Sequence, residues 1–179
     1  MEKNIETAIF GGGCFWCTEA IFKDIKGVIN VNPGYSGGEK ENPTYEEVSG
    51  GNTGHVEVIK IEFDKTQVSF AKLLEVFFAT HNPTTLNKQG NDVGTQYRSV
   101  IFCMNNEQKE EAERKIKELT ENKTFDKEIV TKVEDYKNFF PAEDYHKNYY
   151  ESHKDAPYCM LVIAPKIEKF SKKFGDIKK

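Results

Sequence analysis

The stretch Gly11-Gly12-Gly13-Cys14-Phe15-Trp16-Cys17-Thr18-Glu19 decides the fold that we expect for this chain. It follows a short apolar run at residues 7–10 and precedes a segment with helical periodicity. We therefore expect a buried strand that turns through three glycines into a helix beginning near Cys14. Backbone N–H groups at a helix N-terminus lack intrahelical partners and lie at the positive end of the helix dipole. This position should lower the pKa of the Cys14 thiol and favour its nucleophilic thiolate.

A second cysteine, Cys17, follows three residues later. In a helix the Cα atoms of such a pair lie about 5 Å apart, which is within disulfide range. Two other interpretations stay open: a pair of inert buried thiols, or half of a zinc site, although Cys103 and Cys159 stand isolated in the sequence. A phosphate-binding turn is disfavoured, because Trp16 stands where a dinucleotide fingerprint requires its third glycine. We expect Cys103 in the core and Cys159 to be structural or redox-active.

Composition excludes several functional classes. The 179 residues carry 25 basic and 29 acidic side chains, spread along the chain, with a formal net charge of −4. No basic block suggests nucleic acid or an acidic membrane, and no apolar run approaches the ~18 residues that span a bilayer. The N-terminus lacks the features of a signal peptide. We therefore expect a cytoplasmic protein, in which cysteines serve catalysis or metal binding more often than stable disulfides.

The rest of the chain interleaves helices and strands. Ser69 is expected to cap a helix with a buried stripe formed by Phe70, Leu73, Leu74, Phe77 and Phe78. Further helices are predicted at residues 15–26, 106–122 and 144–153, and strands at 27–31, 55–63, 99–103, 129–133 and 158–163. A long surface loop is expected at 32–53, a polar loop at 89–94, and a basic, at best amphipathic, tail at 166–179. The connections are too long and irregular for regular βαβ winding. We expect a single α+β domain over residues 1–179, with a mixed central sheet flanked by helices and long irregular loops.

Several polar side chains are candidates for chemistry. In the predicted strand 55–63, Glu57 lies on the more apolar face, and a buried carboxyl there could act as a general acid near neutral pH. The alternative is a strand-end glutamate that simply reaches water. The neighbouring His55 is expected to face the opposite way. Tyrosines in the loops could offer O–H groups to a polar substrate or only pack. Asp92 is by default a turn residue that bonds its own backbone.

Seven segments recur in order in a known family. They are Gly13-Cys14-Phe15-Trp16, Gly34-Tyr35-Ser36-Gly37-Gly38, Asn42-Pro43-Thr44-Tyr45, Gly54-His55-Val56-Glu57, His81-Asn82-Pro83-Thr84, the run from Gln89 to Ser99, and Pro141-Ala142-Glu143-Asp144-Tyr145-His146. Over residues 7–169 the chain closely resembles the A-type peptide methionine sulfoxide reductases. The resemblance implies reduction of methionine-S-sulfoxide, free and within proteins, as repair of oxidative damage.

The resemblance also implies roles for individual residues. These are Cys14 as the nucleophile, Glu57 as the acid that protonates the sulfoxide oxygen, Tyr45 and Tyr97 as hydroxyls that hold this oxygen, Asp92 as a support acting through water, and Phe15 and Trp16 as the apolar wall for the substrate methyl group. Attack on the sulfoxide would leave methionine and a sulfenic acid, which a nearby thiol converts to a disulfide.

The recycling cysteines depart from some relatives, whose glycine-rich tails carry one or two more. Here no cysteine follows Cys159, and other members of the family have a cysteine at the position of Cys17. The resemblance therefore implies Cys17 as the resolving thiol, with Cys159 in reserve as a direct resolver or a relay. The resemblance implies reduction by thioredoxin or another dithiol. We further expect no bound metal or organic cofactor, and a monomer that binds neither nucleic acid nor membranes. The alternatives are a thioredoxin-type dithiol oxidoreductase and a zinc-binding interaction module.

Overall fold

A six-stranded mixed sheet forms the centre of the protein. The computed structural model describes residues 4–179, and its sheet has the order β7-β6-β1-β3-β2-β8. All neighbouring strands are antiparallel except β6 and β7, which are parallel. The strands are β1 (Ile5–Gly11), β2 (Val28–Ser36), β3 (Val56–Asp64), β6 (Val100–Cys103), β7 (Lys132–Asp135) and β8 (Phe140–Pro141). This arrangement confirms the predicted α+β class with a mixed sheet.

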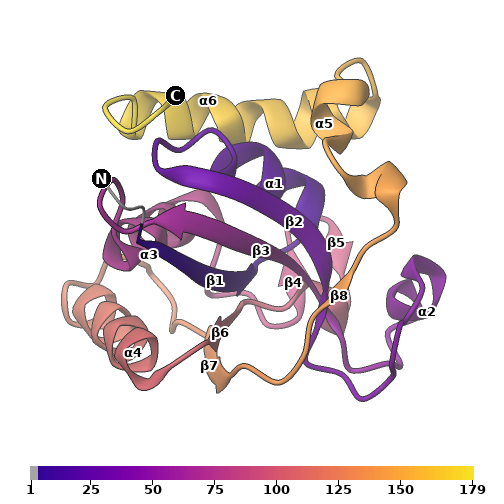
Figure 1. Ribbon diagram of the computed structural model, residues 1–179, viewed down its shortest axis with the longest axis horizontal. Coiled ribbons are helices and arrows are strands. Elements are labelled where there is room, and N and C mark those ends of the chain that lie inside the picture. The colour runs from indigo at the N-terminus through magenta and orange to yellow at the C-terminus, as the bar shows by residue number, and fades with distance from the viewer. Residues whose placement is uncertain (1–3) are drawn as a thin grey trace.

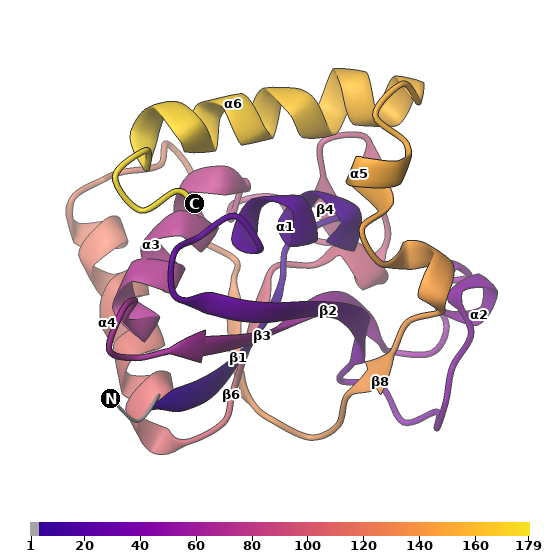
Figure 2. The same ribbon diagram turned by 45° about the horizontal axis from the view of Figure 1, so that its top comes forward.

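Helices gather over one face of the sheet. Figures 1 and 2 show α1 lying across β2 and β3, with α6 stacked outside α1 and α4 beside the β6–β7 edge. The helices are α1 (Phe15–Phe22), α2 (Tyr45–Ser49), α3 (Phe70–Thr80), α4 (Asn106–Glu121), α5 (Tyr149–Ser152) and α6 (Ala164–Lys173). A small hairpin, β4 (Lys88–Gln89) with β5 (Asp92–Val93), replaces the predicted polar loop. No helix within residues 4–179 is long and apolar enough to cross a membrane.

The core is formed, as predicted, by apolar residues that recur every second residue in the strands and about every 3.6 residues in the helices. Ser69 caps α3 by accepting the Lys72 N–H, and the whole predicted stripe of α3 is buried. On β3, alternate residues point to opposite faces. Ile59, Ile61 and Phe63 join the main cluster under the helices, whereas Val56 and Val58 join a smaller cluster on the other face that Phe139 covers.

Two predictions in the N-terminal half are wrong. The helix predicted to residue 26 ends at Phe22, because Ile25 forms a β-bridge with Lys178 near the C-terminus instead of continuing the helix. The strand predicted at 27–31 runs on to Ser36, inside the supposed surface loop, and Tyr35 and Ser36 are fully buried. Glycine and proline suggested a loop there, but β3 pairs with this segment along its whole length.

Predictions in the C-terminal half also need correction. The strand predicted at 158–163 is a π-helical turn, Cys159–Ile163, that continues into α6. Cys159 and Ile163 are buried while Met160 and Leu161 are exposed, which is a helical rather than an alternating pattern. The helix predicted at 144–153 splits into a 3₁₀ turn, Asp144–His146, and α5, because Asn148 between them is left-handed with φ of 53°. The strand predicted at 129–133 lies at β7 instead.

Candidate active site

Cys14 lies where β1 turns into α1. Gly13 has φ of +85°, and a Cβ on it would lie 2.7 Å from the Gln89 side chain, so only glycine fits this turn. Its N–H donates to the Tyr97 carbonyl at 3.2 Å. Cys14 is the N-cap residue of α1, with φ of −64° and ψ of 129°. The predicted strand–glycine–helix geometry is therefore present, and it places the thiol just beyond the C-terminal end of the inner strand β1.

Glu57 reaches the same point from β3. Its side chain is 1% exposed, and its Oε1 accepts the backbone N–H of Phe15 at 3.2 Å. Burial raises the pKa of Glu57 to about 8, and the Phe15 N–H only partly offsets this. The side chain is therefore mostly a neutral carboxylic acid at pH 7, next to the first residue of α1. Strand alternation indicated its apolar face, and the alternative of a glutamate that reaches water is wrong.

The two thiols differ in acidity, in the opposite sense to the sequence prediction. Burial is the main reason that the pKa of Cys14 rises well above its ordinary value, and the Cys17 thiol and the Glu57 charge add to it. The Trp16 backbone N–H acts in the predicted direction, but desolvation outweighs it. The pKa of Cys17 falls to about 7, chiefly through a hydrogen bond from Cys14 and further through the charge of Lys166. In the free protein the thiolate therefore forms on Cys17.

Cys159 joins these two thiols in one buried apolar cluster, although 142 residues separate it from Cys17. It is 0% exposed on the π-helical turn, and burial raises the pKa of its thiol. None of these three cysteines forms a disulfide in the structure. Cys103, by contrast, lies in the main core on β6, as predicted. The structure thus brings together three of the four cysteines, whereas the sequence spacing indicated only two.

Asp92 contacts the site through a tyrosine that the sequence analysis did not select. The Tyr158 hydroxyl donates to Asp92 Oδ2 at 2.8 Å and lies 3.7 Å from Cys17 Sγ. The contact with Tyr158 also lowers the pKa of Cys17, by less than the hydrogen bond from Cys14 or the charge of Lys166. Asp92 is therefore not merely a turn residue. The sequence signal available for Tyr158 was its position directly before Cys159.

His146 is a second residue that the sequence analysis missed. Trp16 Nε1 donates to His146 Nδ1 at 3.0 Å. Nδ1 therefore carries no hydrogen, and the neutral imidazole has its hydrogen on Nε2. His146 is 0% exposed, and burial lowers its pKa. Its Nε2 has no hydrogen-bond partner within residues 4–179. It lay in the Pro141–His146 motif, but nothing in that motif indicated contact with Trp16.

The predicted apolar wall divides into a buried and an accessible part. Phe15 is 0% exposed and packs under Tyr35 and His146. Trp16 is half-buried, and its indole stacks on Tyr149 with centroids 3.6 Å apart and ring planes 7° from parallel. Of these two aromatic residues, only Trp16 is therefore partly accessible from outside the protein.

Tyr45 and Tyr97 face the same site from different segments. Both are half-buried. Burial is the largest cause of their raised pKa values, and the charges of Glu57 and Cys14 contribute to both. Both phenols therefore keep their protons and can donate hydrogen bonds at neutral pH. Tyr45 begins α2, where its N–H donates to Glu143 Oε2 at 3.0 Å.

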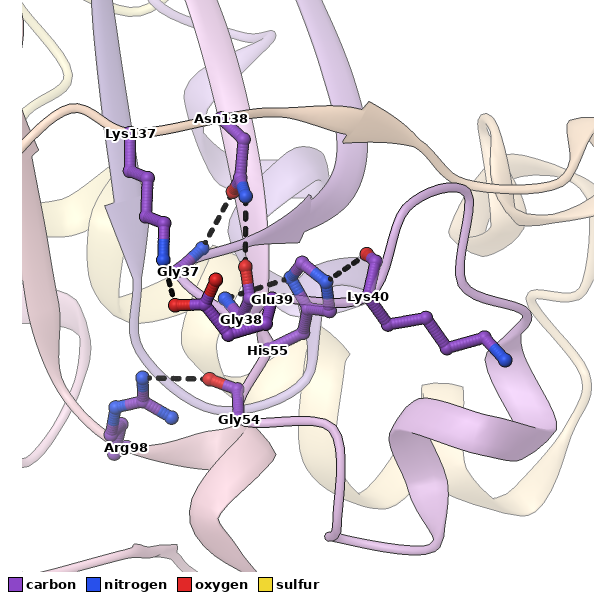
Figure 3. Close-up of polar contacts among 9 residues, drawn as sticks. All are labelled: Gly37, Gly38, Glu39, Lys40, Gly54, His55, Arg98, Lys137 and Asn138. Atoms are coloured by element: carbon purple, nitrogen blue, oxygen red, sulfur yellow. Dashed lines mark hydrogen bonds and ion pairs between the residues drawn. The ribbon is translucent and has the colours of Figure 1, made fainter.

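His55 does not join this group. Figure 3 shows its ring between two backbone groups of the preceding loop: Nδ1 accepts the Gly38 N–H at 3.0 Å, and Nε2 lies 2.7 Å from the Lys40 carbonyl. The Asn138 side chain bonds the backbone of Gly37 and Gly38 in the same loop. His55 and Asn138 therefore hold the loop that leads from β2 towards Tyr45, and their role is structural.

Comparison with known proteins agrees with this arrangement. The family model described as peptide methionine sulfoxide reductase matches residues 6–178. The peptide methionine sulfoxide reductase MsrA of Saccharolobus solfataricus is 55% identical over 172 residues, which cover 96% of each chain. The crystal structure of reduced Mxr1 from Saccharomyces cerevisiae superposes with a TM-score of 0.80 at 30% identity, over 87% of this chain and 89% of Mxr1. Mxr1 in complex with Trx2 superposes with a TM-score of 0.57 at 20% identity, over 83% of this chain and 89% of that one. The match of the family model to residues 6–178 and the 55% identity to a relative over 96% of both chains show that the protein is a thiol-dependent oxidoreductase of the peptide methionine sulfoxide reductase A family.

Proposed function

We propose that the site reduces methionine-S-sulfoxide by attack of Cys14 on the sulfoxide sulfur. A sulfoxide oxygen leaves only when it is protonated, and Glu57 is the neutral acid beside the thiol. Glu57 gives its proton to the oxygen and receives the Cys14 proton in exchange. The Cys14 sulfur bonds to the substrate sulfur, and the protonated oxygen then passes as a hydroxyl from the substrate sulfur to the Cys14 sulfur. This transfer breaks both the S–O bond of the substrate and the new S–S bond, so methionine leaves with two more electrons and Cys14 becomes a sulfenic acid. The buried, protonated Glu57 is the observation that carries this proposal.

Substrate orientation follows from the groups around the thiol. Tyr45 and Tyr97 donate hydrogen bonds to the sulfoxide oxygen, and the Trp16 indole receives the methyl group, with Phe15 beneath it. An oxygen and a methyl group held on different sides of the sulfur select one epimer, which we assign as S. Asp92 supports the oxygen side by fixing Tyr158.

The sulfenic acid is resolved by Cys17. Its thiolate, which forms near pH 7, attacks the Cys14 sulfur, the hydroxyl leaves as water after taking up a proton, and a Cys14–Cys17 disulfide forms. Cys159 lies in the same cluster and is the reserve resolver or a relay for this disulfide. The complex of Mxr1 with Trx2 supports thioredoxin as the dithiol that completes the cycle.

The proposal extends to the whole chain. Residues 1–179 act as one catalytic domain, a monomer in the cytoplasm, on free as well as peptide-bound methionine sulfoxide. The reaction needs no metal or organic cofactor, because Cys14 supplies the electrons and Glu57 the proton.

Turnover of the separate epimers tests this function. With dithiothreitol as reductant, the protein should reduce methionine-S-sulfoxide and leave the R epimer, and Cys14→Ser should abolish turnover. Absence of turnover of the S epimer would instead favour a general dithiol oxidoreductase, which requires neither Glu57 nor the tyrosines. Stoichiometric zinc in protein purified under reducing conditions would count against catalysis. Mass spectrometry after one turnover without reductant identifies the partner of Cys14 directly.

A further inference from the structure

Glu143 is an acidic residue that the proposed chemistry does not use, although tyrosines from three separate segments hydrogen-bond to it. The hydroxyl of Tyr35 on β2 donates to Oε1 at 2.9 Å, and the backbone N–H of Tyr45 on α2 donates to Oε2 at 3.0 Å. The hydroxyl of Tyr145 also donates to Oε2, at 3.3 Å. The Glu143 side chain therefore joins β2, the start of α2 and the 3₁₀ turn Asp144–His146 at one point.

Both carboxylate oxygens of Glu143 act as acceptors, so an amide could not make the same contacts. The side chain is half-buried. Burial works against its ionisation, but the hydrogen bonds from Tyr45 and Tyr35 outweigh burial and hold the pKa of Glu143 below its ordinary value. A carboxylate only accepts hydrogen bonds, whereas an amide would turn its NH₂ group towards one of these donors. The three contacts therefore fit a carboxylate at this position.

The helix α2 depends on such contacts because it is only five residues long. A helix of this length is not stable by itself in water, and Figures 1 and 2 both show α2 at the edge of the molecule, apart from the other helices. A capping box between Thr44 and Glu47 and the burial of Val48 in the main core stabilise other parts of it. The N–H of Tyr45, the first residue of α2, has no acceptor within the helix, and Glu143 supplies one.

The segment that carries Glu143 also contacts the ring of Tyr45. The imidazole of His146 lies against this ring with centroids 4.5 Å apart, and it accepts the indole N–H of Trp16. Tyr45 is therefore contacted at its backbone nitrogen by Glu143 and at its ring by His146. This segment sets where the Tyr45 phenol lies relative to Trp16, and Glu143 fixes the backbone from which the phenol projects.

We propose that Glu143 is a positioning residue for Tyr45: its carboxylate holds the start of α2 so that the Tyr45 hydroxyl reaches the sulfoxide oxygen. The inference rests on the proposed role of Tyr45 as a donor to that oxygen. Without this anchor the hydroxyl is less well placed during attack by Cys14, so the reaction slows. The loss through Tyr45 cannot exceed the roughly 10²-fold loss expected when the hydroxyl itself is removed.

Glu143→Gln tests the proposal, because glutamine keeps the size of the side chain but turns an NH₂ group towards one donor. In single turnover of N-acetyl-methionine-(S)-sulfoxide amide without reductant, its maximal rate should fall about tenfold, as expected for part of a charge-assisted hydrogen bond. Inhibition by the product, N-acetyl-methionine amide, should stay within about twofold of wild type, because this ligand has no oxygen for Tyr45 to hold. An unchanged rate, or an equal loss in product binding, would overturn the proposal.

Glu47→Gln is the matched control. Glu47 accepts the backbone N–H of Thr44 at 2.8 Å, one residue before Tyr45, and glutamine can take the same place in a capping box. The maximal rate of this variant should therefore stay within about twofold of wild type. A tenfold loss here as well would mean that the rate reports only the stability of α2, which would overturn the specific role of Glu143.

A double-mutant cycle tests whether Glu143 acts through Tyr45. If it does, Glu143→Gln should add no further loss of rate to Tyr45→Phe, whereas independent, additive losses would contradict the proposal. If Glu143→Gln fails to fold, Glu143→Asp replaces it, because a side chain shorter by one methylene keeps the charge but cannot reach both Tyr45 and Tyr35. Its rate should also fall about tenfold, with no further loss in the Tyr45→Phe background, and a wild-type rate would overturn the proposal.

A structural measurement separates this inference from the proposed function. A wild-type rate in Tyr45→Phe would refute the role of Tyr45 in the reaction. The crystal structure of Glu143→Gln, or of Glu143→Asp, still tests the anchor: the Tyr45 ring should move relative to Trp16, and an unmoved ring would overturn the positioning by Glu143.

Discussion

Replacement of Glu57 by glutamine should separate the stability of this protein from its chemistry. The folded protein keeps a proton on Glu57 up to a pKa of about 8, whereas in the unfolded chain the ordinary value is 4.5. Between these two values folding takes up a proton, so the contribution of Glu57 to stability falls as the pH rises. The full difference is about 3.5 pH units, or about 5 kcal/mol. Glutamine has the shape of the protonated acid and no charge to desolvate, so it avoids this loss.

The expected result is a difference in the free energy of unfolding between Glu57→Gln and wild type that depends on pH. The free energy of unfolding of Glu57→Gln, minus that of wild type, should grow by about 4 kcal/mol between pH 5 and pH 9, most of it below pH 8. Urea unfolding at a series of pH values, followed by circular dichroism, measures this difference. In the same variant the rate of methionine release in the first turnover should fall by roughly 10²–10⁴, because the amide cannot give up a proton.

Glu62→Gln is the matched control for this experiment. Glu62 lies on the same strand, is half-buried, and accepts a hydrogen bond from Asn30 at 3.3 Å near the surface. The free energy of unfolding of Glu62→Gln should stay within about 0.5 kcal/mol of the wild-type value across the pH range. Parallel curves for wild type and Glu57→Gln would refute the reasoning, because they would show that Glu57 has the same pKa in the folded and unfolded states. An unchanged first-turnover rate would show that the carboxyl is not the acid.

Four further variants test the other groups of the site. Cys17→Ser should release about one methionine per enzyme but fail to cycle with thioredoxin, as the resolving step is missing; normal cycling would assign resolution to Cys159. Tyr45→Phe and Tyr97→Phe should each slow the first turnover by roughly 10²-fold, because each removes a donor to the sulfoxide oxygen. Wild-type first-turnover rates in rapid-quench assays would contradict that role. His146→Leu should shift the Trp16 emission and weaken substrate binding by about tenfold, because the indole N–H loses its acceptor; identical emission spectra would argue against this contact.

Local sequence patterns predicted much of the fold. The stripe of α3 with its Ser69 cap, the alternation along β3, and the glycine turn into α1 are each specified by residues close in sequence. The apolar position of Glu57 followed from the same alternation, because a two-residue period assigns every side chain of a strand to a face. These features were predictable because propensity, capping and periodicity are local properties of the chain.

Other features depended on partners far away in sequence. The end of α1 is set by the C-terminal residues that pair with Ile25, and β2 extends through Gly34 and Pro33 because β3 provides a pairing edge. The apolar segment after Tyr158 has too little periodicity to distinguish strand from helix. In the structure this segment is helical, and Cys159 is buried in the same apolar cluster as Cys14 and Cys17.

The sequence by itself determined the family and the fold class and indicated the residues that we propose as nucleophile and acid, because each was encoded in a short motif or a regular spacing. Only the tertiary structure decided which way the pKa of Cys14 moves, since burial and the Glu57 charge from another strand outweigh the helix N-terminus. It also decided that Tyr158 and His146 contact Cys17 and Trp16. The physical reason is that desolvation and hydrogen bonding depend on which distant segments come into contact, and local sequence patterns do not specify those contacts.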